Sequence, residues 1–164
     1  MRKPFLILFI TIICLLTGCE NKEPPVPIRE FEGQMHIDKS YTGGQFDIDA
    51  QVSFLSEGVG EIFVTSPDEL CTLCFSWDEC FDMSYQGLHC QTEKGYLPHN
   101  AFAQAVYAVI NDLEDSKCQS FSEGTATFVG VCESGEYTLI TDRKGYVQNI
   151  SIEEINLSAD FTYN

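Results

Sequence analysis

The stretch Phe46-Asp47-Ile48-Asp49-Ala50-Gln51-Val52-Ser53-Phe54 decides the fold, because apolar and polar residues alternate along it without a break. Successive side chains of a β-strand point to opposite faces of a sheet, so this alternation predicts a strand with one buried and one solvated face. Such strands are typical of antiparallel sheets that cover a core on one side only. The chain must therefore supply further strands and a cover for their apolar face.

Short strand-like segments separated by turn residues lie on both sides of this stretch. A segment with Met35 and Ile37 precedes it through Tyr41–Gly44, and Glu61–Thr65 follows a turn at Ser56–Gly58. Connections this short join antiparallel neighbours. The same reasoning predicts strands at Leu73–Trp77, Phe81–Tyr85, Leu88–Thr92, Thr125–Cys132, Glu136–Thr141, Val147–Ile152 and Leu157–Tyr163.

One helix is predicted between the two groups of strands, from Asn100 to Glu114. Pro98 and a candidate N-cap at Asn100 mark its start, and a loop rich in Ser and Gly follows it. Its apolar residues recur at spacings of three and four: Phe102, Val106, Val109, Ile110 and Leu113. The predicted fold class is therefore α+β, with a strongly curved antiparallel sheet, an incomplete barrel of about ten strands, wrapping one main helix.

The N-terminus carries the pattern of a lipoprotein signal. Arg2 and Lys3 precede a twelve-residue apolar run, Phe5–Leu16, which is too short for the roughly 20 residues that span a bilayer. Leu16-Thr17-Gly18-Cys19 reads as a lipobox and resembles bacterial lipoprotein signal peptides. That resemblance implies cleavage before Cys19 and acylation of Cys19, with palmitate among the acyl chains. The competing interpretation is an ordinary secretory signal followed by an incidental cysteine.

The remaining chain divides into a tether and a domain. Glu20–Pro27 is polar and contains three prolines, so it is predicted to be extended. We expect a signal peptide at residues 1–18, a lipidated cysteine and Pro-rich tether at 19–30, and a half-barrel domain at 31–164. The predicted location is the extracytoplasmic face of the cell membrane, reached through the covalent lipid.

The charge of the chain excludes one class of partner. Of its nine basic residues, Arg2 and Lys3 belong to the signal, which contains no acid, so seven basic and 25 acidic residues remain, a formal net charge of −18. Polyanion binding requires clustered Lys and Arg, and only Arg143 and Lys144 are adjacent, so a nucleic-acid partner is excluded.

An even set of cysteines remains in the predicted domain. In an exported protein such a set suggests disulfides, and we expect a Cys118–Cys132 bridge with one or two bridges among the others. A zinc site at Cys71-x-x-Cys74 with neighbouring ligands, and thiol redox chemistry, are less favoured alternatives, because there is one C-x-x-C and it precedes a strand rather than a helix. The candidates are Cys71, Cys74, Cys80, Cys90, Cys118 and Cys132.

No arrangement of residues requires catalysis. His36, His89 and His99 are not beside a recognisable nucleophile motif, and Asp47 and Asp49 lie on the polar side of their strand without the spacing of a calcium loop. We therefore predict a protein that is not an enzyme and needs neither metal nor cofactor.

The order of elements resembles a known superfamily. Phe63–Pro67 leads to Leu73–Trp77, then to Leu88, to Leu97-Pro98 before the helix, and finally to Glu136–Leu139. This order is similar to that of the LolA-like half-barrel lipoproteins, over roughly residues 31–164, and in particular to small lipoproteins of single-membrane bacteria. The resemblance implies an incomplete barrel with a concave apolar pocket.

The resemblance also implies a ligand, a lipid or the acyl chain of a lipoprotein, held between sheet and helix. We expect the protein to be a monomer. An alternating apolar face is also the pattern of an ordinary core, so the alternative is a non-catalytic envelope interaction or scaffold module with a filled core. The residues predicted to line the pocket are Phe46, Ile48, Val52, Phe54, Phe75, Trp77, Tyr85, Phe102, Val106 and Ile110.

Overall fold

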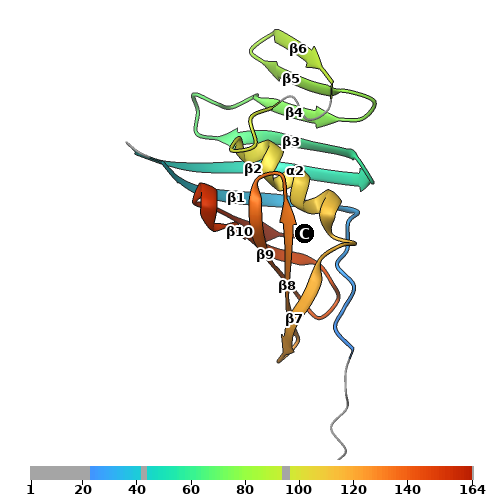
Figure 1. Ribbon diagram of the computed structural model, residues 1–164. Helices are drawn as coiled ribbons and strands as arrows, with labels where there is room; N and C mark the ends of the chain where they lie inside the picture. Colours follow the sequence, from blue (N-terminus) through green and yellow to red (C-terminus); the bar gives the residue numbers. More distant parts are fainter. Residues whose placement is uncertain (1–22, 42–43, 94–96, 164) are drawn as a thin grey trace, which may run out of the picture.

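Eleven antiparallel strands form one continuous sheet in the computed structural model, which describes residues 23–41, 44–93 and 97–163 (Figure 1). Their order across the sheet is β6-β5-β4-β3-β2-β1-β11-β10-β9-β8-β7. The strands are β1 (Phe31–Tyr41), β2 (Gly44–Ser56), β3 (Val59–Ser66), β4 (Cys74–Trp77), β5 (Phe81–Tyr85), β6 (Leu88–Thr92), β7 (Lys117–Ser122), β8 (Thr125–Cys132), β9 (Gly135–Thr141), β10 (Val147–Ile152) and β11 (Leu157–Thr162).

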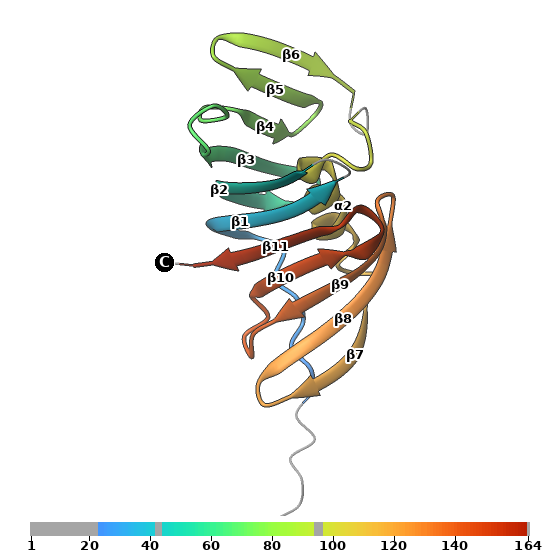
Figure 2. The ribbon, with the colours of Figure 1, turned by 90° about the vertical axis from the view of Figure 1, so that its left-hand side faces the viewer.

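Most neighbours in this sheet are also neighbours in the chain. The exception is the pair of β1 and β11, which places Met35 opposite Phe161 and joins the two halves of the sheet. The sheet curves strongly and its end strands, β6 and β7, lie far apart (Figure 2). The predicted fold class, a curved antiparallel sheet that wraps one main helix, is confirmed.

The burial of β2 follows its alternating sequence. Ile48, Ala50 and Val52 are buried, whereas Asp47 and Asp49 are exposed. The alternation continues on both neighbouring strands, so the concave face of the sheet is apolar and the convex face is polar. One helix has to cover the concave face.

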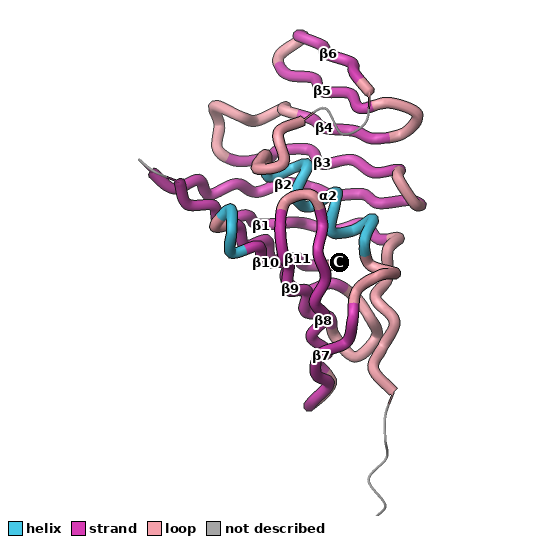
Figure 3. The backbone as a smooth tube through the Cα atoms, in the orientation of Figure 1, coloured by secondary structure: helices cyan, strands magenta, loops and turns pink. Residues whose placement is uncertain are grey.

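That helix is α2 (Phe102–Asp112), which lies against the concave side of the sheet (Figure 3). It is shorter than predicted by two residues at each end, and Asn100 is not its N-cap. The N-cap is Ala101, without a side-chain cap, because the chain first turns through a hydrogen bond from the Ala101 N–H to the Pro98 carbonyl. A single turn of 3-10 helix, η1 (Glu153–Ile155), connects β10 and β11.

One strand was not predicted. Lys117–Ser122, expected to be a loop, is β7, and it pairs with β8 at the edge of the sheet. Its residues are nearly all exposed, so it lacks the apolar alternation from which the other strands were predicted. Pairing with β8 alone fixes its conformation.

The signal peptide at residues 1–18 and Cys19 lie outside the described residues. Of the predicted tether, residues 23–30 contain neither helix nor strand, and their final part contacts the domain: the Ile28 N–H donates to the Gly145 carbonyl, and Arg29 pairs with Glu114 at 3.1 Å. Among the helices that the structure describes, none has the length and apolar character of a bilayer span.

Candidate functional site

The space beneath α2, where the sequence predicts a pocket, is filled by packed side chains. Val106 and Val109 of α2 are fully buried, as are Ile62 of β3 and Ile150 of β10. Aromatic rings close the same core towards β4: Trp77 stacks on Tyr107 with ring centroids 4.5 Å apart. In this structure the helix itself therefore occupies the concavity.

The ten predicted pocket residues divide into three groups by burial. Phe102 packs against the core with part of its surface exposed and meets the edge of Phe75 at 5.4 Å. Phe46 is 45% exposed, and Tyr85 is half-buried. The buried members are Ile48, Val52, Phe54, Phe75, Trp77, Val106 and Ile110. The structure thus brings eight of the ten together, as core.

A separate apolar hollow, here called the end groove, lies on the concave face where α2 does not reach. Met83 and Tyr85 alternate with the buried Phe81 on β5 and so share its face, and their partners on β6 are Cys90 and Leu88. The hollow measures about 350 Å³, and Leu88 at its rim is 73% exposed. Its lining residues are Leu70, Leu73, Met83, Tyr85, Leu88, His89 and Cys90.

The wall of the end groove is fixed by hydrogen bonds. The Tyr85 hydroxyl donates to the Glu69 carbonyl and so ties the β3–β4 loop to β5. Within that loop the Leu70 N–H donates to the Pro67 carbonyl at 2.9 Å. On the convex side of the hairpin, His89 Nε2 lies 2.7 Å from an Asp82 carboxylate oxygen. The Tyr85 bond is therefore the contact that holds loop and hairpin together beside the apolar hollow.

Of the residues that line the end groove, sequence reasoning found Tyr85 as a pocket residue, Cys90 as a disulfide candidate and His89 as a neighbouring ligand of the zinc alternative. It assigned no role to Leu70, Leu73, Met83 or Leu88. The alternation Phe81, Met83, Tyr85 was a visible signal for an apolar face at this position. The sequence could not show that α2 leaves this part of the apolar face uncovered.

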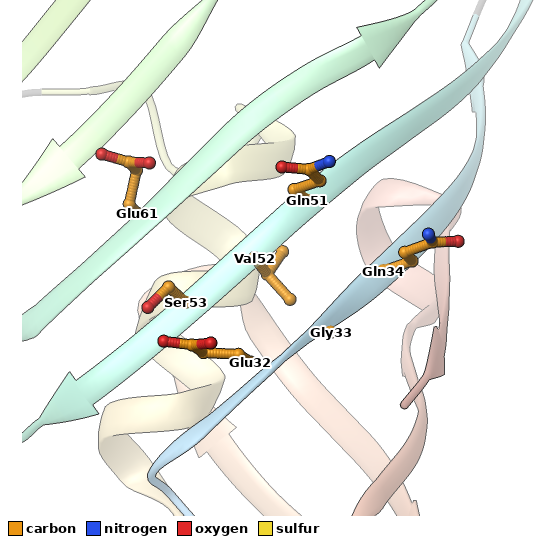
Figure 4. A pocket seen from close by; sticks show the side chains of 7 residues that line it. All are labelled: Glu32, Gly33, Gln34, Gln51, Val52, Ser53 and Glu61. Carbon is orange, nitrogen blue, oxygen red and sulfur yellow. The ribbon is translucent and has the colours of Figure 1, made fainter. Parts of the chain in front are cut away.

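The convex face carries a second, polar hollow. It spans β1, β2 and β3 and measures about 460 Å³, with Glu32, Gln34, Gln51 and Glu61 around it and the α2 ribbon behind the sheet (Figure 4). Gly33 and the small Ser53 are also among its lining residues. This face can offer hydrogen bonds to a polar partner, but its open shape encloses nothing.

Beside that hollow, one histidine has acidic neighbours. His36 Nδ1 lies 2.7 Å from Asp49 Oδ1, and this hydrogen bond, with charge from Asp49, Asp47 and Asp160, raises the pKa of His36 above 6.5, although burial acts in the opposite direction. Both side chains are more than half exposed, so the pair is a surface interaction.

All six cysteines that were disulfide candidates are free thiols. The predicted Cys118–Cys132 bridge is wrong for this register, because Cys118 pairs with Phe128, four residues from Cys132 along β8. Four strand residues span about 13 Å, well beyond the roughly 7 Å limit between bridged Cα atoms. Within the first group, the register of β4, β5 and β6 places Cys74 and Cys90 on opposite faces of the sheet.

One partly buried thiol, Cys74, has the chemistry of an inert group. Burial, followed by the charge and hydrogen bond of Glu61 and the charge of Asp82, raises the pKa of Cys74 to about 11. Within the described part of the chain, no group of three or more His, Cys, Asp or Glu side chains is placed to hold a metal ion.

Comparison with known proteins gives matches of structure alone. No family model and no curated protein matches the sequence. Among solved structures, a LolA superfamily protein from Nitrosomonas europaea is similar with a TM-score of 0.46 and 10% identity, over 84% of this chain and 87% of that one. The complex of the CwlD amidase from Clostridioides difficile with the GerS lipoprotein contains a chain similar with a TM-score of 0.47 and 10% identity, over 100% of this chain and 96% of that one.

The first of these structures carries the name of the superfamily that the sequence resembles. At such low identity the similarity concerns the fold alone, and neither ligands nor partners follow from it.

Proposed function

We propose that this protein is a non-catalytic interaction module, tethered by a lipid on Cys19 to the extracytoplasmic face of the membrane, whose half-barrel is a solid scaffold for a protein or envelope partner. The observation that carries the proposal is the filled concavity, where Val106 and Val109 of α2 are fully buried against the sheet. A scaffold needs a rigid core and exposed recognition surfaces, and this core is complete without a ligand.

The sequence supports the tether. Leu16-Thr17-Gly18-Cys19 ends a short apolar run, and the acidic domain is repelled by anionic headgroups, so a covalent lipid is the more effective attachment. Two or three acyl chains suffice to hold a protein on a bilayer, since each buried CH₂ contributes about 0.8 kcal/mol.

The rival function is that of a carrier with a lipid or acyl chain between sheet and helix. To admit such a ligand, α2 would have to leave the sheet and expose its buried aliphatic side chains. Each costs about 1.5–3 kcal/mol when transferred to water, so a ligand would have to replace the whole contact. The packing of Trp77 on Tyr107 adds to that cost.

Native mass spectrometry separates the two functions. The full chain is extracted gently from membranes and compared with an unrelated domain fused behind residues 1–30, which carries the same anchor. We expect both to retain the covalent lipid and neither to retain further lipid. Additional lipid on the wild type, absent from the fused control domain, would overturn the proposal in favour of a carrier.

The anchor has its own test. Cys19→Ser removes the acylated thiol and is expected to shift the folded protein from the membrane fraction to the soluble fraction. Cys118→Ser, at an exposed thiol in β7, is the matched control and should stay with the membrane. Retention of Cys19→Ser on the membrane would contradict lipid tethering.

A further inference from the structure

Among the described residues, β6 ends the sheet, and no other strand of that part of the chain pairs with its outer edge. A two-residue turn with Gln86 and Gly87 at positive φ, of 47° and 82°, joins it to β5. The residues that flank such a turn form a hydrogen-bonded pair, and bonded pairs then alternate along the hairpin. The backbone N–H and C=O groups of His89 and Gln91 therefore point away from β5, towards the open side.

The other end strand, β7, is protected against pairing. It begins with Lys117, and a bulge between Cys118 and Ser120 interrupts its register. A lysine and a bulge are devices by which natural sheets prevent another strand from adding to an edge. The sequence of β6, Leu88-His89-Cys90-Gln91-Thr92, contains neither Lys nor Pro, and its register with β5 is unbroken.

The end groove lies directly beside this edge. Leu88 and Cys90 face the groove, so a strand added next to β6 would present alternate side chains to the same apolar hollow. About 350 Å³ is room for one or two aliphatic side chains, and Leu88 is already 73% exposed without a partner. Main-chain pairing and an adjacent pocket are the two elements of recognition by strand addition.

The charge around the edge selects the partner. Residues 67–93 contain six acids and neither Lys nor Arg. Asp82 lies on the convex side of the same hairpin, opposite to the groove, so the two faces of an added strand would meet different surroundings. A second copy of this chain would bring two acidic segments together and is disfavoured by the same charge.

We propose that β6 accepts an extended segment of a partner protein by strand addition, with apolar side chains in the end groove and alternating Lys or Arg facing the acidic residues of 67–93. This inference rests on the proposed function, since it names the recognition surface of the interaction module. The two proposals can fail independently, because a carrier could bind lipid under α2 whether or not β6 pairs with a peptide.

The probe is a fluorescein-labelled heptapeptide of alternating lysine and valine, blocked at both ends and added to the full chain under reducing conditions. Fluorescence anisotropy at 0.15 M salt should show saturable binding. A peptide of the same charge with proline in place of the central valine should bind at least tenfold more weakly, because proline cannot complete the ladder. Equal binding of both peptides would show mere charge attraction and overturn the proposal.

Two variants of the protein address the edge and the groove. Gln91→Pro removes an outward N–H and should weaken binding at least tenfold, whereas its control, Gln91→Thr, keeps the N–H and should bind like the wild type. Leu88→Asp should also weaken binding at least tenfold, and Val131→Asp, at a site of 67% exposure on β8, should not. Equal affinity of Gln91→Pro and Gln91→Thr would overturn strand addition.

Other occupants give different results in the same experiment. If the groove instead takes an acyl chain, a fluorescent fatty acid binds, Gln91→Pro leaves that binding unchanged, and the peptide does not compete. If a second copy occupies the edge, the wild type sediments as a dimer that Gln91→Pro dissociates. Either result would overturn the proposal, whereas added protection of the His89 and Gln91 amides from hydrogen exchange by the peptide would support it.

Discussion

The part of the sheet under α2 and the end formed by β4, β5 and β6 share one sequence pattern but differ in burial. Ile48 and Val52 on β2 are almost fully buried, whereas Met83 and Tyr85 on β5 are only partly so. Beyond the helix, the concave face is a hollow with an exposed leucine at its rim. Alternation of apolar residues therefore predicts which face of a strand is apolar. Whether that apolar face becomes core or an exposed binding surface depends on whether α2 covers it.

Simple dimensions explain the difference. Eleven strands at about 4.8 Å spacing give a sheet roughly 48 Å wide, whereas the eleven residues of α2 extend about 16 Å. Even on a curled sheet, one such helix cannot reach both ends of the sheet. In both ribbon views β5 and β6 lie beyond α2, whereas β4 still packs on the helix through Trp77 and Phe75 (Figures 1 and 2).

The largest expected effect comes from the boundary between the two regions. Trp77 is 1% exposed and packs on Tyr107, so Trp77→Ala should lower the free energy of unfolding by about 3–5 kcal/mol. Leu88→Ala at the rim should change it by less than about 0.5 kcal/mol. Urea denaturation of both variants measures the difference directly, and similar losses would abolish the distinction between core and groove.

Trp77→Phe is the control for that substitution. The indole Nε1 of Trp77 is buried without a hydrogen-bond partner, so replacing the indole by a phenyl ring removes an unsatisfied donor together with some packing. The variant should therefore lose clearly less stability than Trp77→Ala.

The covered region was largely predictable from the sequence. Its strands have the period of two, and Val106, Val109 and Ile110 have the spacing of a helix, so fold class and core followed from local patterns. Whether the core under the helix is filled or hollow depends on side chains from distant strands. Both interpretations remained open for that reason.

The end region and the edges were less predictable. β7 has an exposed, polar sequence, and its strand conformation comes from pairing with β8. The Cys118–Cys132 pairing failed because it depended on a register shift of four residues, which composition and spacing do not reveal. The end groove depends on the length of α2, a property of three-dimensional cover rather than of any single strand.

A smaller loss of stability is expected when the hydrogen bond between α2 and β9 is removed. The Tyr137 hydroxyl donates to Asp112 Oδ2 at 2.7 Å, and Tyr137→Phe should cost about 2 kcal/mol, since hydrogen bonds to charged groups contribute about 1.5–3 kcal/mol. Tyr163→Phe, which removes a bond to the Val147 carbonyl without involving α2, is the matched control and should leave exchange of the α2 amides unchanged. Equal hydrogen exchange of the α2 amides in the two variants would show that the Tyr137 hydrogen bond does not stabilise the helix.

The same tyrosine gives a dependence on alkaline pH. Burial, followed by the bond to Asp112, raises the pKa of Tyr137 well above its ordinary value of 10.0. The unfolded chain then loses this proton first, so the stabilisation is complete below pH 10 and declines as the pH rises above it. Tyr137→Phe should therefore show a shallower loss of stability above pH 10 in denaturant titrations.

Within the end region, the two faces should differ in thiol reactivity. Cys74 on the convex side, with its pKa raised to about 11, should react with iodoacetamide at pH 8 at least tenfold more slowly than the exposed Cys90 beside the groove. Glu61→Gln removes a contributing charge and should speed the reaction of Cys74 a few fold, whereas Glu32→Gln should not. Mass spectrometry of tryptic peptides measures each rate, and equal rates at the two thiols would contradict the shielding of Cys74.

The smallest effect concerns the convex face of the covered region. His36 titrates above 6.5 because Asp49, Asp47 and Asp160 favour its charged form, which NMR of the imidazole resonances can follow. Asp49→Asn should lower that pKa, whereas Asp38→Asn on the same strand face should leave it nearly unchanged. An unaltered pKa in Asp49→Asn would show that the 2.7 Å contact does not persist in solution.

The sign of the linked stability follows from the raised pKa. The stabilisation by His36 is fully present below pH 6.5 and is lost as the pH rises through the higher pKa of the folded state. Because both partners are exposed, it amounts to less than about 1 kcal/mol. The convex face therefore adds little to stability, and its polar side chains remain free to change without loss of the fold, unlike those that close the core beneath α2.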